Sequence, residues 1–476
     1  MSLSNEILAG FVLIYNSLVL LYFFAINTGY LFLLGLSGLE LRYHNKRRTV
    51  DICQGDSCEL APDVAILVPA YNERATISSS LSSLQKLDYP NLELIVVNDG
   101  STDDTLKEIK QKFKLIPVAR EPENTVESED VREVYKSVSD ERILVVDKEN
   151  GGKADALNAG LNYSRSDLFL AIDADSLVEK GSLYRLVEPY LTKDTNVVGI
   201  GGIVRVSNGC KIRGSEIEEA RTPSKLLPSI QVMEYIRAFL FGRTGWSRLN
   251  SLPIISGAFG LFQTNLVKNI GGYRTNTVGE DMDLVVRLHK YMREKKEDYT
   301  ISFIPDPVCW TQVPSSMSVL SRQRNRWQRG LAEALTYNWK MIGNPKYGTI
   351  GLLGLPFFVI FELLGPLVEV SGYIVFIISF FMGWVNVPFA ILFITLALVY
   401  GILLSVLSLL LEEFTLKRYE NPLDRVKLML MAFLENFGYR QLHALWRFKG
   451  LIDFFRKSSS WGEMIRESIE SEAENT

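Results

Sequence analysis

Hydrophobic residues in this chain collect in two long stretches that flank a more polar middle. The first, residues 8–39, contains no charged side chain and is long enough to cross a bilayer with some tilt. The second, residues 348–411, is interrupted by a segment containing Gly and Pro at 383–388. We therefore expect one crossing at 361–382 and another at 389–411, joined by a short external loop.

Two less regular apolar segments accompany the second stretch. Residues 348–358 contain Pro356 and fit an interfacial or re-entrant segment. Residues 426–455 are apolar but include four polar side chains that a lipid-facing span disfavours, so a re-entrant or interfacial helix pair fits them better than a simple crossing. These four side chains are Glu435, Arg440, His443 and Arg447.

Basic residues are distributed unevenly around the predicted crossings. No Lys or Arg precedes the first stretch, and four residues follow it closely: Arg42, Lys46, Arg47 and Arg48. By the positive-inside rule, the N-terminus lies outside and residue 42 onward lies in the cytoplasm. A second basic cluster follows the last predicted crossing, as this topology requires: Lys417, Arg418, Arg425 and Lys427. We expect a multi-pass protein of the cell membrane with a cytoplasmic middle.

These patterns divide the chain into five parts. In order, they are an N-terminal transmembrane helix, a cytoplasmic domain, an amphipathic interface helix, a group of transmembrane or re-entrant helices, and a polar cytoplasmic tail. Their respective bounds are 1–41, 42–314, 315–347, 348–457 and 458–476.

The cytoplasmic middle alternates short apolar runs with helical patterns. We predict strands at 64–69, 92–97, 143–146 and 168–172, and helices at 76–86, 104–113 and 284–292. Continuous apolar strands that alternate with helices indicate a parallel α/β sheet covered on both faces. Ligands of such sheets bind beyond the carboxyl ends of the strands. The polar residues at those ends are Asn72, Glu73, Asp99, Asp147, Asp173 and Asp175.

The composition of the chain argues against several classes of function. A net charge of −4 gives no support for nucleic-acid binding. Three histidines in the whole chain argue against a His-based metal site or a Ser-His-Asp enzyme. Of the four cysteines, Cys53 and Cys58 could pair or bind metal, but a cytoplasmic setting favours free thiols. Residues 121–141 are highly charged, so we expect a solvated insertion without a catalytic role.

Two motifs at the strand ends have the chemistry of a diphosphate site. Asp173 and Asp175 follow an apolar strand, and such a pair suits Mg²⁺ or Mn²⁺ bridging a diphosphate, although a solvated turn also uses Asp. The run from Gly151 to Asn158 opens a helix, where its glycines and Lys153 could approach phosphates closely. The alternative is packing glycines beside an exposed lysine, and we favour contact with the substrate.

Three acids in the run 279–283 precede a helix. Capping accounts for one or two of them, and Asp281 is a candidate general base for an attacking sugar hydroxyl. From the spacing alone, both interpretations stay open. The small-residue run 256–260 contains Gly257 and Ala258 and suits a floor for a flat sugar, although tight packing would explain it almost as well.

Residues 317–341 form an amphipathic helical pattern. Gln323, Arg326 and Trp327 share one face at helical spacing, and that face offers an amide, a phosphate-binding fork and a flat apolar ring. A membrane-surface helix without chemistry would have a similar basic and apolar pattern. Both interpretations can hold for the same helix.

Taken together, these motifs resemble the membrane-embedded family 2 glycosyltransferases, which include cellulose, curdlan, hyaluronan and poly-N-acetylglucosamine synthases. Asp99 matches the uridine-binding aspartate, and Asp173-Ala174-Asp175 matches the DxD motif of the family. Glu280-Asp281 matches the catalytic acids, with Gly279 where the cellulose-type version has Thr. Residues 323–327 match the QxxRW motif. The resemblance covers nearly the whole chain.

The resemblance implies a GT-A-type, Rossmann-like cytoplasmic domain inserted between transmembrane helices. It implies inverting transfer of glucose or N-acetylglucosamine from a UDP-sugar, with Asp281 as base, Glu280 beside it and Mg²⁺ or Mn²⁺ on Asp173 and Asp175. The implied donor contacts are Ala70, Tyr71, Glu73, Asp99, Lys153, Asp173 and Arg326. The implied acceptor contacts are Gln323, Trp327, Gly257 and Ala258.

Two products fit the resemblance. One is a growing β-linked polysaccharide exported through the membrane helices, and the other is a membrane lipid that receives one or a few sugars. QxxRW favours the polymer, whereas the small number of spans argues against a self-sufficient channel. We expect no PilZ-like regulatory domain, since only about 20 acidic and polar residues follow the last apolar segment.

Overall fold

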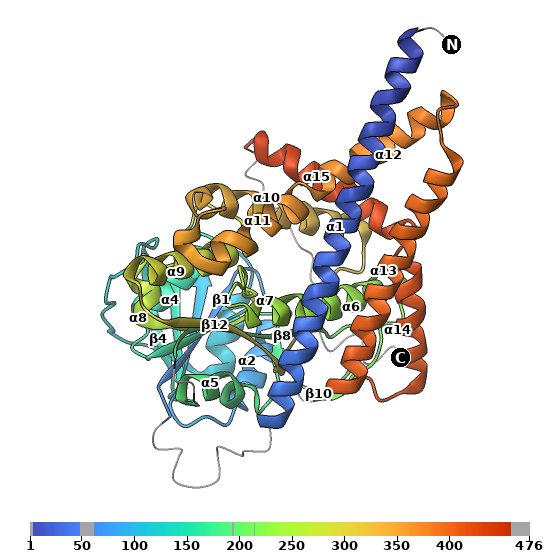
Figure 1. The fold of residues 1–476 in the computed structure, drawn as a ribbon. Helices are drawn as coiled ribbons and strands as arrows, with labels where there is room; N and C mark the ends of the chain where they lie inside the picture. The colour runs from blue at the N-terminus through green and yellow to red at the C-terminus, as the bar shows by residue number, and fades with distance from the viewer. Residues whose placement is uncertain (1–2, 48–60, 193–194, 214, 458–476) are drawn as a thin grey trace.

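The computed structural model describes residues 3–47, 61–192, 195–213 and 215–457. Cys53, Cys58 and the predicted polar tail lie outside these residues. Cys210 and Cys309 are buried free thiols. An α/β domain forms one body of the molecule, and a long N-terminal helix runs past it beside the C-terminal helices (Figure 1).

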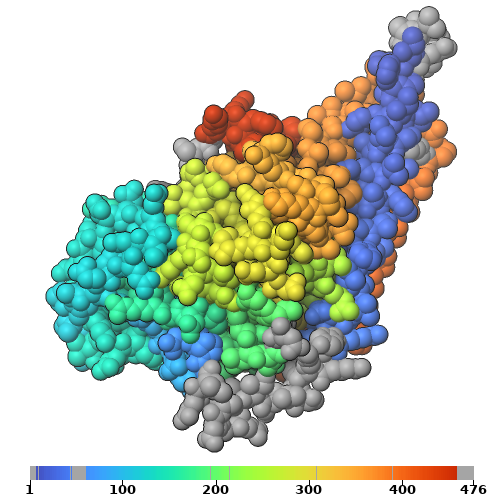
Figure 2. Space-filling view, turned by 60° about the vertical axis from the view of Figure 1, so that its left-hand side comes forward, coloured from blue at the N-terminus to red at the C-terminus, as the bar shows by residue number. Residues whose placement is uncertain are grey.

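Three helices of the described chain are long and apolar enough to cross a membrane. They span Gly10–Arg42 within α1 (Leu3–Arg47), Ile350–Phe381 ending in α12 (Gly365–Phe381), and Ala390–Thr415 within α13 (Val387–Thr415). Large apolar side chains of α1 such as Phe11, Leu18 and Phe32 are exposed. Figure 2 shows α1 extending as a rod beyond the α/β domain, beside the helices that follow residue 350. This is the surface of a membrane protein, as the hydrophobic pattern predicts.

The second apolar stretch differs from expectation at its start. Residues 350–363 are helical throughout, as π-helix η5 (Ile350–Gly354), α11 (Leu355–Phe357) and π-helix η6 (Phe358–Leu363). The apolar helical run therefore begins at Ile350 and not near residue 361. Ile350 and Leu355 are buried with Met341 and Val286, so packing against the α/β domain holds this first part of the run. Its depth in a membrane stays a prediction.

The domain is built on one ten-stranded sheet in the order β3-β4-β5-β2-β1-β6-β11-β8-β12-β7. The predicted strands are confirmed as β1 (Val64–Ala70), β2 (Leu92–Asp99), β5 (Ile143–Lys148) and β6 (Leu168–Ile172), which pair in parallel. The remaining strands are β3 (Leu115–Pro117), β4 (Val131–Ser137), β7 (Leu177–Val178), β8 (Asn196–Val206), β11 (Phe259–Gln263) and β12 (Tyr299–Thr311). A separate hairpin joins β9 (Lys211–Arg213) and β10 (Glu216–Glu219).

The sheet is mixed and not purely parallel as the strand pattern indicated. β11 lies antiparallel between β6 and β8, and β4 lies antiparallel beside β5. The interpretation of residues 121–141 as a solvated insertion is wrong for β4, which is part of the sheet. Val134 and Tyr135 of β4 are buried while its charged residues face water, an arrangement typical of a strand near a sheet edge.

Helices cover both faces of the sheet. In Figure 1, α4 (Lys153–Tyr163), α8 (Thr264–Asn269) and α9 (Glu280–Lys295) lie above the sheet, and α2 (Ile77–Gln85) and α5 (Ser182–Thr192) lie below it. The predicted helix at 104–113 is confirmed as α3 (Thr105–Phe113). The strands of the parallel core are almost fully buried, which explains their continuous apolar sequence.

A layer of helices joins the sheet to the apolar helices. It consists of α6 (Leu226–Tyr235), π-helix η2 (Ile236–Arg243), α7 (Thr244–Arg248), α10 (Met317–Tyr337), α14 (Pro422–Leu434) and α15 (Tyr439–Phe455). The helix pair predicted at 426–455 is thus present, while its relation to a membrane stays a prediction. A buried ion pair between Arg205 of β8 and Glu412 of α13, at 2.7 Å, ties the sheet to the last apolar helix.

The amphipathic helix predicted at 317–341 ends earlier. α10 stops at Tyr337, and Trp339 to Met341 form a separate 3-10 turn (η3). Trp339 is exposed and is not part of a continuous apolar stripe with Leu335, which is buried. A second short turn, η4 (Pro345–Tyr347), leads to the apolar run.

Candidate active site

One cavity of about 2340 Å³ runs from the carboxyl ends of the parallel strands to the apolar helices. All the residues named above as donor, acceptor, metal or catalytic contacts line it. Of the polar residues expected at the strand ends, Asp147 does not line it; its carboxylate accepts a hydrogen bond from Asn98 at 2.6 Å. The fold therefore brings together motifs that are far apart in the sequence.

Lys153 and Asp173 meet in the middle of the domain end of the cavity. The ammonium of Lys153, in the first turn of α4, forms an ion pair with Asp173, which follows β6, and donates to the carbonyl of Gly257 at 3.2 Å. Burial opposes the charge of Lys153, but the carboxylates of Asp173, Glu280 and Asp281 raise its pKa above the usual value. Lys153 is therefore a permanent cation beside the acidic motif.

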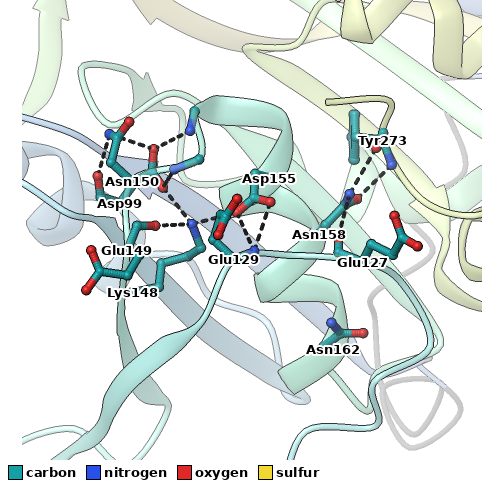
Figure 3. A network of polar contacts seen from close by, with 12 residues as sticks. Asp99, Glu127, Glu129, Lys148, Glu149, Asn150, Asp155, Asn158, Asn162 and Tyr273 are labelled. Carbon is teal, nitrogen blue, oxygen red and sulfur yellow. Dashed lines mark hydrogen bonds and ion pairs between the residues drawn. The ribbon is translucent and has the colours of Figure 1, made fainter. Parts of the chain in front are cut away.

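Asp99 organises the glycine turn that precedes Lys153 (Figure 3). Its two oxygens accept hydrogen bonds from the backbone amides of Gly151 at 3.0 Å and Gly152 at 2.8 Å, and from Asn150 at 3.2 Å. Gly152 has a φ of 88°, which a residue with a side chain adopts only with strain. Asp99 thus shapes the loop at the edge of the cavity, whereas its expected uridine contact stays a prediction.

A lysine that the sequence patterns did not single out completes this network. Lys148, at the end of β5, is fully buried and lies 2.8 Å from Asp99 and 2.5 Å from Asp155 of α4. It also donates to the carbonyl of Glu149. The available signal was a lysine that continues a buried apolar strand, since a buried lysine needs anionic partners.

The three acids at the start of α9 have different surroundings. The helix begins after Gly279, and this N-cap residue has no side chain to accept from the first turn. Asp283 is buried and pairs with Arg287 at 2.7 Å and Arg274 at 3.2 Å, which is a structural role. Glu280 and Asp281 line the cavity instead.

Asp281 is held in place by backbone amides. One of its oxygens accepts from the amide of Gly257 at 3.3 Å and the other from the amide of Met282 at 2.8 Å. Burial and the neighbouring Asp281 raise the pKa of Glu280 to about 7, against the opposing effect of Lys153 and Arg326. Glu280 therefore keeps its proton to a higher pH than an exposed glutamate does, which limits the negative charge beside Asp281.

A backbone contact explains why glycine precedes these acids. A Cβ on Gly279 would lie 2.5 Å from the carbonyl oxygen of Gly330 on α10, and a Cβ on Gly330 would lie 2.8 Å from Gly279. The two glycines let the start of α9 and the middle of α10 touch. The helix start that carries Glu280 and Asp281 is thus in direct contact with the helix that carries the QxxRW motif.

The QxxRW residues occupy the α10 face that the spacing predicted. Gln323, Arg326 and Trp327 line the cavity, and Trp327 is 44% exposed. Ser316 caps the helix by accepting from the amide of Val319. Arg326 affects the charge state of Glu280, which shows that α10 and α9 contribute to one electrostatic site.

Sequence reasoning also missed Arg243, a cation that lines the cavity. It ends π-helix η2 and lies over the ring of Phe239 at 3.8 Å. Burial lowers the pKa of Arg243 to about 10, while Asp281 acts in the opposite direction. The periodicity of the surrounding sequence contains no signal for it, because a π-helix follows neither the helical nor the strand period.

The acidic motif fits a divalent cation held jointly with a ligand. Within the described residues, no group of three or more His, Cys, Asp or Glu could hold a metal by itself. Asp173 and Asp175 supply carboxylate oxygens on one wall of the cavity. Mg²⁺ is commonly held by one or two carboxylates together with substrate phosphates, so this donor set suits that mode.

All three apolar helices contribute to the far end of the cavity. Phe23 and Asn27 come from α1, Glu369 and Tyr373 from α12, and Phe393 from α13. The wall is therefore partly polar and partly aromatic. The same cavity thus touches both the acids and the apolar helices.

A mixed sheet with acids at its strand ends, carboxylates at the start of α9 and an arginine on the cavity face of α10 are features of the GT-A glycosyltransferases. The chain belongs to glycosyltransferase family 2: the model described as "Glycosyltransferase like family 2" matches residues 62–330. The model described as "Chitin synthase" matches residues 260–420.

Two similar curated proteins are poly-β-1,6-N-acetyl-D-glucosamine synthases. That of Staphylococcus epidermidis is 28% identical over 284 residues, covering 60% of this chain and 58% of the relative. That of Staphylococcus aureus (strain COL) is 28% identical over 298 residues, covering 62% and 60%. The match thus spans less than two thirds of these relatives.

A solved structure shares the fold. The mannosyltransferase of Pyrobaculum calidifontis, in complex with GDP-Man and Mn²⁺, superposes with a TM-score of 0.51 at 18% identity. The superposition covers 89% of this chain and 99% of the mannosyltransferase.

Proposed function

We propose that this protein is an inverting hexosyltransferase that extends a β-linked polysaccharide from a UDP-sugar at the cytoplasmic face of the cell membrane. The observation that carries the proposal is the single cavity that joins Asp173, Asp281 and Trp327 to all three apolar helices. The similarity to poly-β-1,6-N-acetylglucosamine synthases favours UDP-N-acetylglucosamine over UDP-glucose as donor.

In the proposed reaction, Asp281 accepts the proton of an acceptor hydroxyl while the hydroxyl oxygen attacks the anomeric carbon. The bond from that carbon to the diphosphate breaks with its electron pair, and UDP leaves. The two backbone amides that hold Asp281 aim its carboxylate into the cavity. Lys153 and Arg326 stabilise the negative charge that develops on the departing diphosphate. Attack opposite the leaving group inverts the anomeric configuration.

A divalent cation belongs to this proposal. Asp173 and Asp175 would hold Mg²⁺ or Mn²⁺, which would offset charge on the diphosphate. The Mn²⁺ in the mannosyltransferase of the same fold supports a divalent metal. Trp327, Gln323, Gly257 and Ala258 would contact the acceptor.

The cavity also bears on export and on the alternative acceptor. Its far wall contains Glu369, Tyr373 and Arg447, polar groups that suit a hydrated glycan passing between the apolar helices. The aromatic residues Phe376 and Phe393 on the same wall suit a lipid-linked acceptor. We therefore propose coupled polymer export first, and transfer of one or a few sugars to a membrane lipid second.

Product sizing separates these possibilities. Membranes with the protein are incubated with UDP-[¹⁴C]N-acetylglucosamine or UDP-[¹⁴C]glucose, and products are divided into lipid-extractable and polymeric fractions. We expect radioactive polymer from the first donor. Product that is short and lipid-extractable would refute the polymer. Asp281→Asn should lower turnover by about 10²–10⁴-fold, the usual contribution of a general base, and unchanged turnover would refute its role.

A further inference from the structure

Arg324 is the second residue of the QxxRW run, and it lies against the ring of Trp327, the fifth residue. Its guanidinium carbon is 4.3 Å from the ring centroid of Trp327. Arg324 is 3% exposed, whereas Trp327 is 44% exposed to the cavity. A planar guanidinium stacked on an indole is attracted to the ring face and opposes rotation of the ring.

The position of Arg324 is in turn set from two other helices. Its Nη2 donates to Glu234 of α6 at 2.5 Å. The hydroxyl of Tyr439, in the first turn of α15, donates to the same carboxylate oxygen at 2.8 Å. The ring of Tyr439 stacks on His443, whose Nε2 lies 3.9 Å from the other oxygen of Glu234. Glu234 thus connects the start of α15 to the guanidinium beneath Trp327.

Further polar contacts hold α10 and α15 together without touching the indole. Asn325 donates to Asp453 of α15 at 2.7 Å. Gln328 accepts from Arg447 of α15 at 2.7 Å. Loss of the contact to Asp453 would weaken helix packing alone, so it serves as a matched control for the contact to Arg324.

We propose that Arg324, Glu234 and Tyr439 are positioning residues that hold the Trp327 ring in the orientation that receives the acceptor. Trp327 lines the cavity, and the affinity of a flat ring for a sugar depends on the angle of that ring. The acceptor part of this inference rests on the proposed function. Because Tyr439 belongs to α15, movement of this helix would also change the orientation of the Trp327 ring.

The ring orientation is testable without any enzymatic assay. The purified protein is labelled with 5-fluorotryptophan, and Trp327→Phe identifies the ¹⁹F resonance of Trp327 among the seven tryptophans. In Arg324→Met and Glu234→Gln, that resonance should shift and narrow because the ring rotates more freely. In Asp453→Ala it should stay unchanged. An unchanged resonance in Arg324→Met, or an equal change in Asp453→Ala, overturns the proposal.

Kinetics test the consequence for the acceptor. With UDP-N-acetylglucosamine and short β-1,6-linked N-acetylglucosamine oligomers, Arg324→Met should raise the acceptor KM about 5- to 20-fold, a loss between the values of an exposed and a fully desolvated cation–π contact. The donor KM should change less than twofold. Arg324→Lys should recover part of the loss, because it restores the charge without the planar fork. Equal changes in both KM values overturn the proposal.

A double variant tests whether Arg324 acts through Trp327. In a Trp327→Ala background, Arg324→Met should raise the acceptor KM no further, because the ring that it positions is absent. Additive effects would overturn the inference. A wild-type protein that transfers no sugar would refute the proposed function, and the fluorine spectra would still decide whether Arg324 positions the ring.

Discussion

Replacing Lys148 with methionine removes the only cation from the network in Figure 3, within the described residues, while keeping the length of the side chain. Asp99 and Asp155 both contact its ammonium, at 2.8 and 2.5 Å, and both are themselves buried. Without Lys148, two carboxylates would face each other within about 5 Å and without a counter-ion. Asp99 would lose its ion pair, and the loop whose amides donate to Asp99 would be held less firmly.

The expected loss is large because Lys148 is fully buried. Removing one partner of a buried ion pair destabilises a protein by about 3–5 kcal/mol, since the remaining charge stays desolvated. For a domain of this size, that corresponds to a fall in Tm of roughly 10 °C. An exposed lysine offers a matched control: Lys346 pairs with Glu294 at 3.7 Å and its side chain is 58% exposed. Lys346→Met should change the stability by less than about 1 kcal/mol.

Thermal unfolding of the detergent-solubilised protein, followed by intrinsic fluorescence, measures these shifts. Adding Asp155→Asn to Lys148→Met should recover part of the lost Tm, because the amide keeps an oxygen acceptor for the backbone amide of Glu129 and removes one negative charge. If Lys148→Met lowers Tm by less than about 2 °C, the reasoning is refuted, because a buried ion pair should contribute more. So would a double variant that is no more stable than the single variant.

Three further predictions concern the start of α9, the core and the metal. Gly279→Ala should lower Tm by several degrees and also reduce turnover, because its Cβ would meet the carbonyl of Gly330 at 2.5 Å and overpacking costs about 1–3 kcal/mol; wild-type stability and activity would contradict this contact. Burial lowers the pKa of His289 to about 4, so the folded protein favours the neutral imidazole. The free energy of unfolding should therefore be highest above pH 6.5 and fall by up to about 3 kcal/mol as the pH decreases from 6.5 to 4. Unfolding at stepped pH should show this slope in the wild type and lose it in His289→Gln. Chelation with EDTA should abolish sugar transfer, and Mg²⁺ or Mn²⁺ should restore it, with more metal needed in Asp175→Asn; transfer that survives chelation would exclude the proposed metal role.

Local pattern was enough to predict much of the domain. The parallel strands β1, β2, β5 and β6 are buried on both faces, so their apolar runs are continuous and readable. The polar residues that follow β1 and β6 meet at one edge, because parallel strands end on the same side of a sheet. The helical spacing of Gln323, Arg326 and Trp327 correctly indicated a shared face.

The direction of β11 and the presence of β4 in the sheet could not be predicted from local pattern. β11 is as apolar as its neighbours, and nothing local says that it enters antiparallel between β6 and β8. Three of the seven residues of β4 are charged and face water, so its composition resembled that of an insertion. Pairing partners are selected by packing among distant segments, and a local pattern does not contain that information.

The apolar helices, the buried parallel strands and the acidic, glycine and QxxRW motifs could all be predicted from the order of residues along the chain. These features depend on periodicity and on the chemistry of residues that are neighbours in the chain. The contacts between distant groups became visible in the folded protein: Lys148 with Asp155, Gly279 with Gly330, and Arg324 with Glu234. Such contacts arise because a folded chain must give each buried charge a partner and each close approach a small residue, and the partner's position in sequence is set by topology.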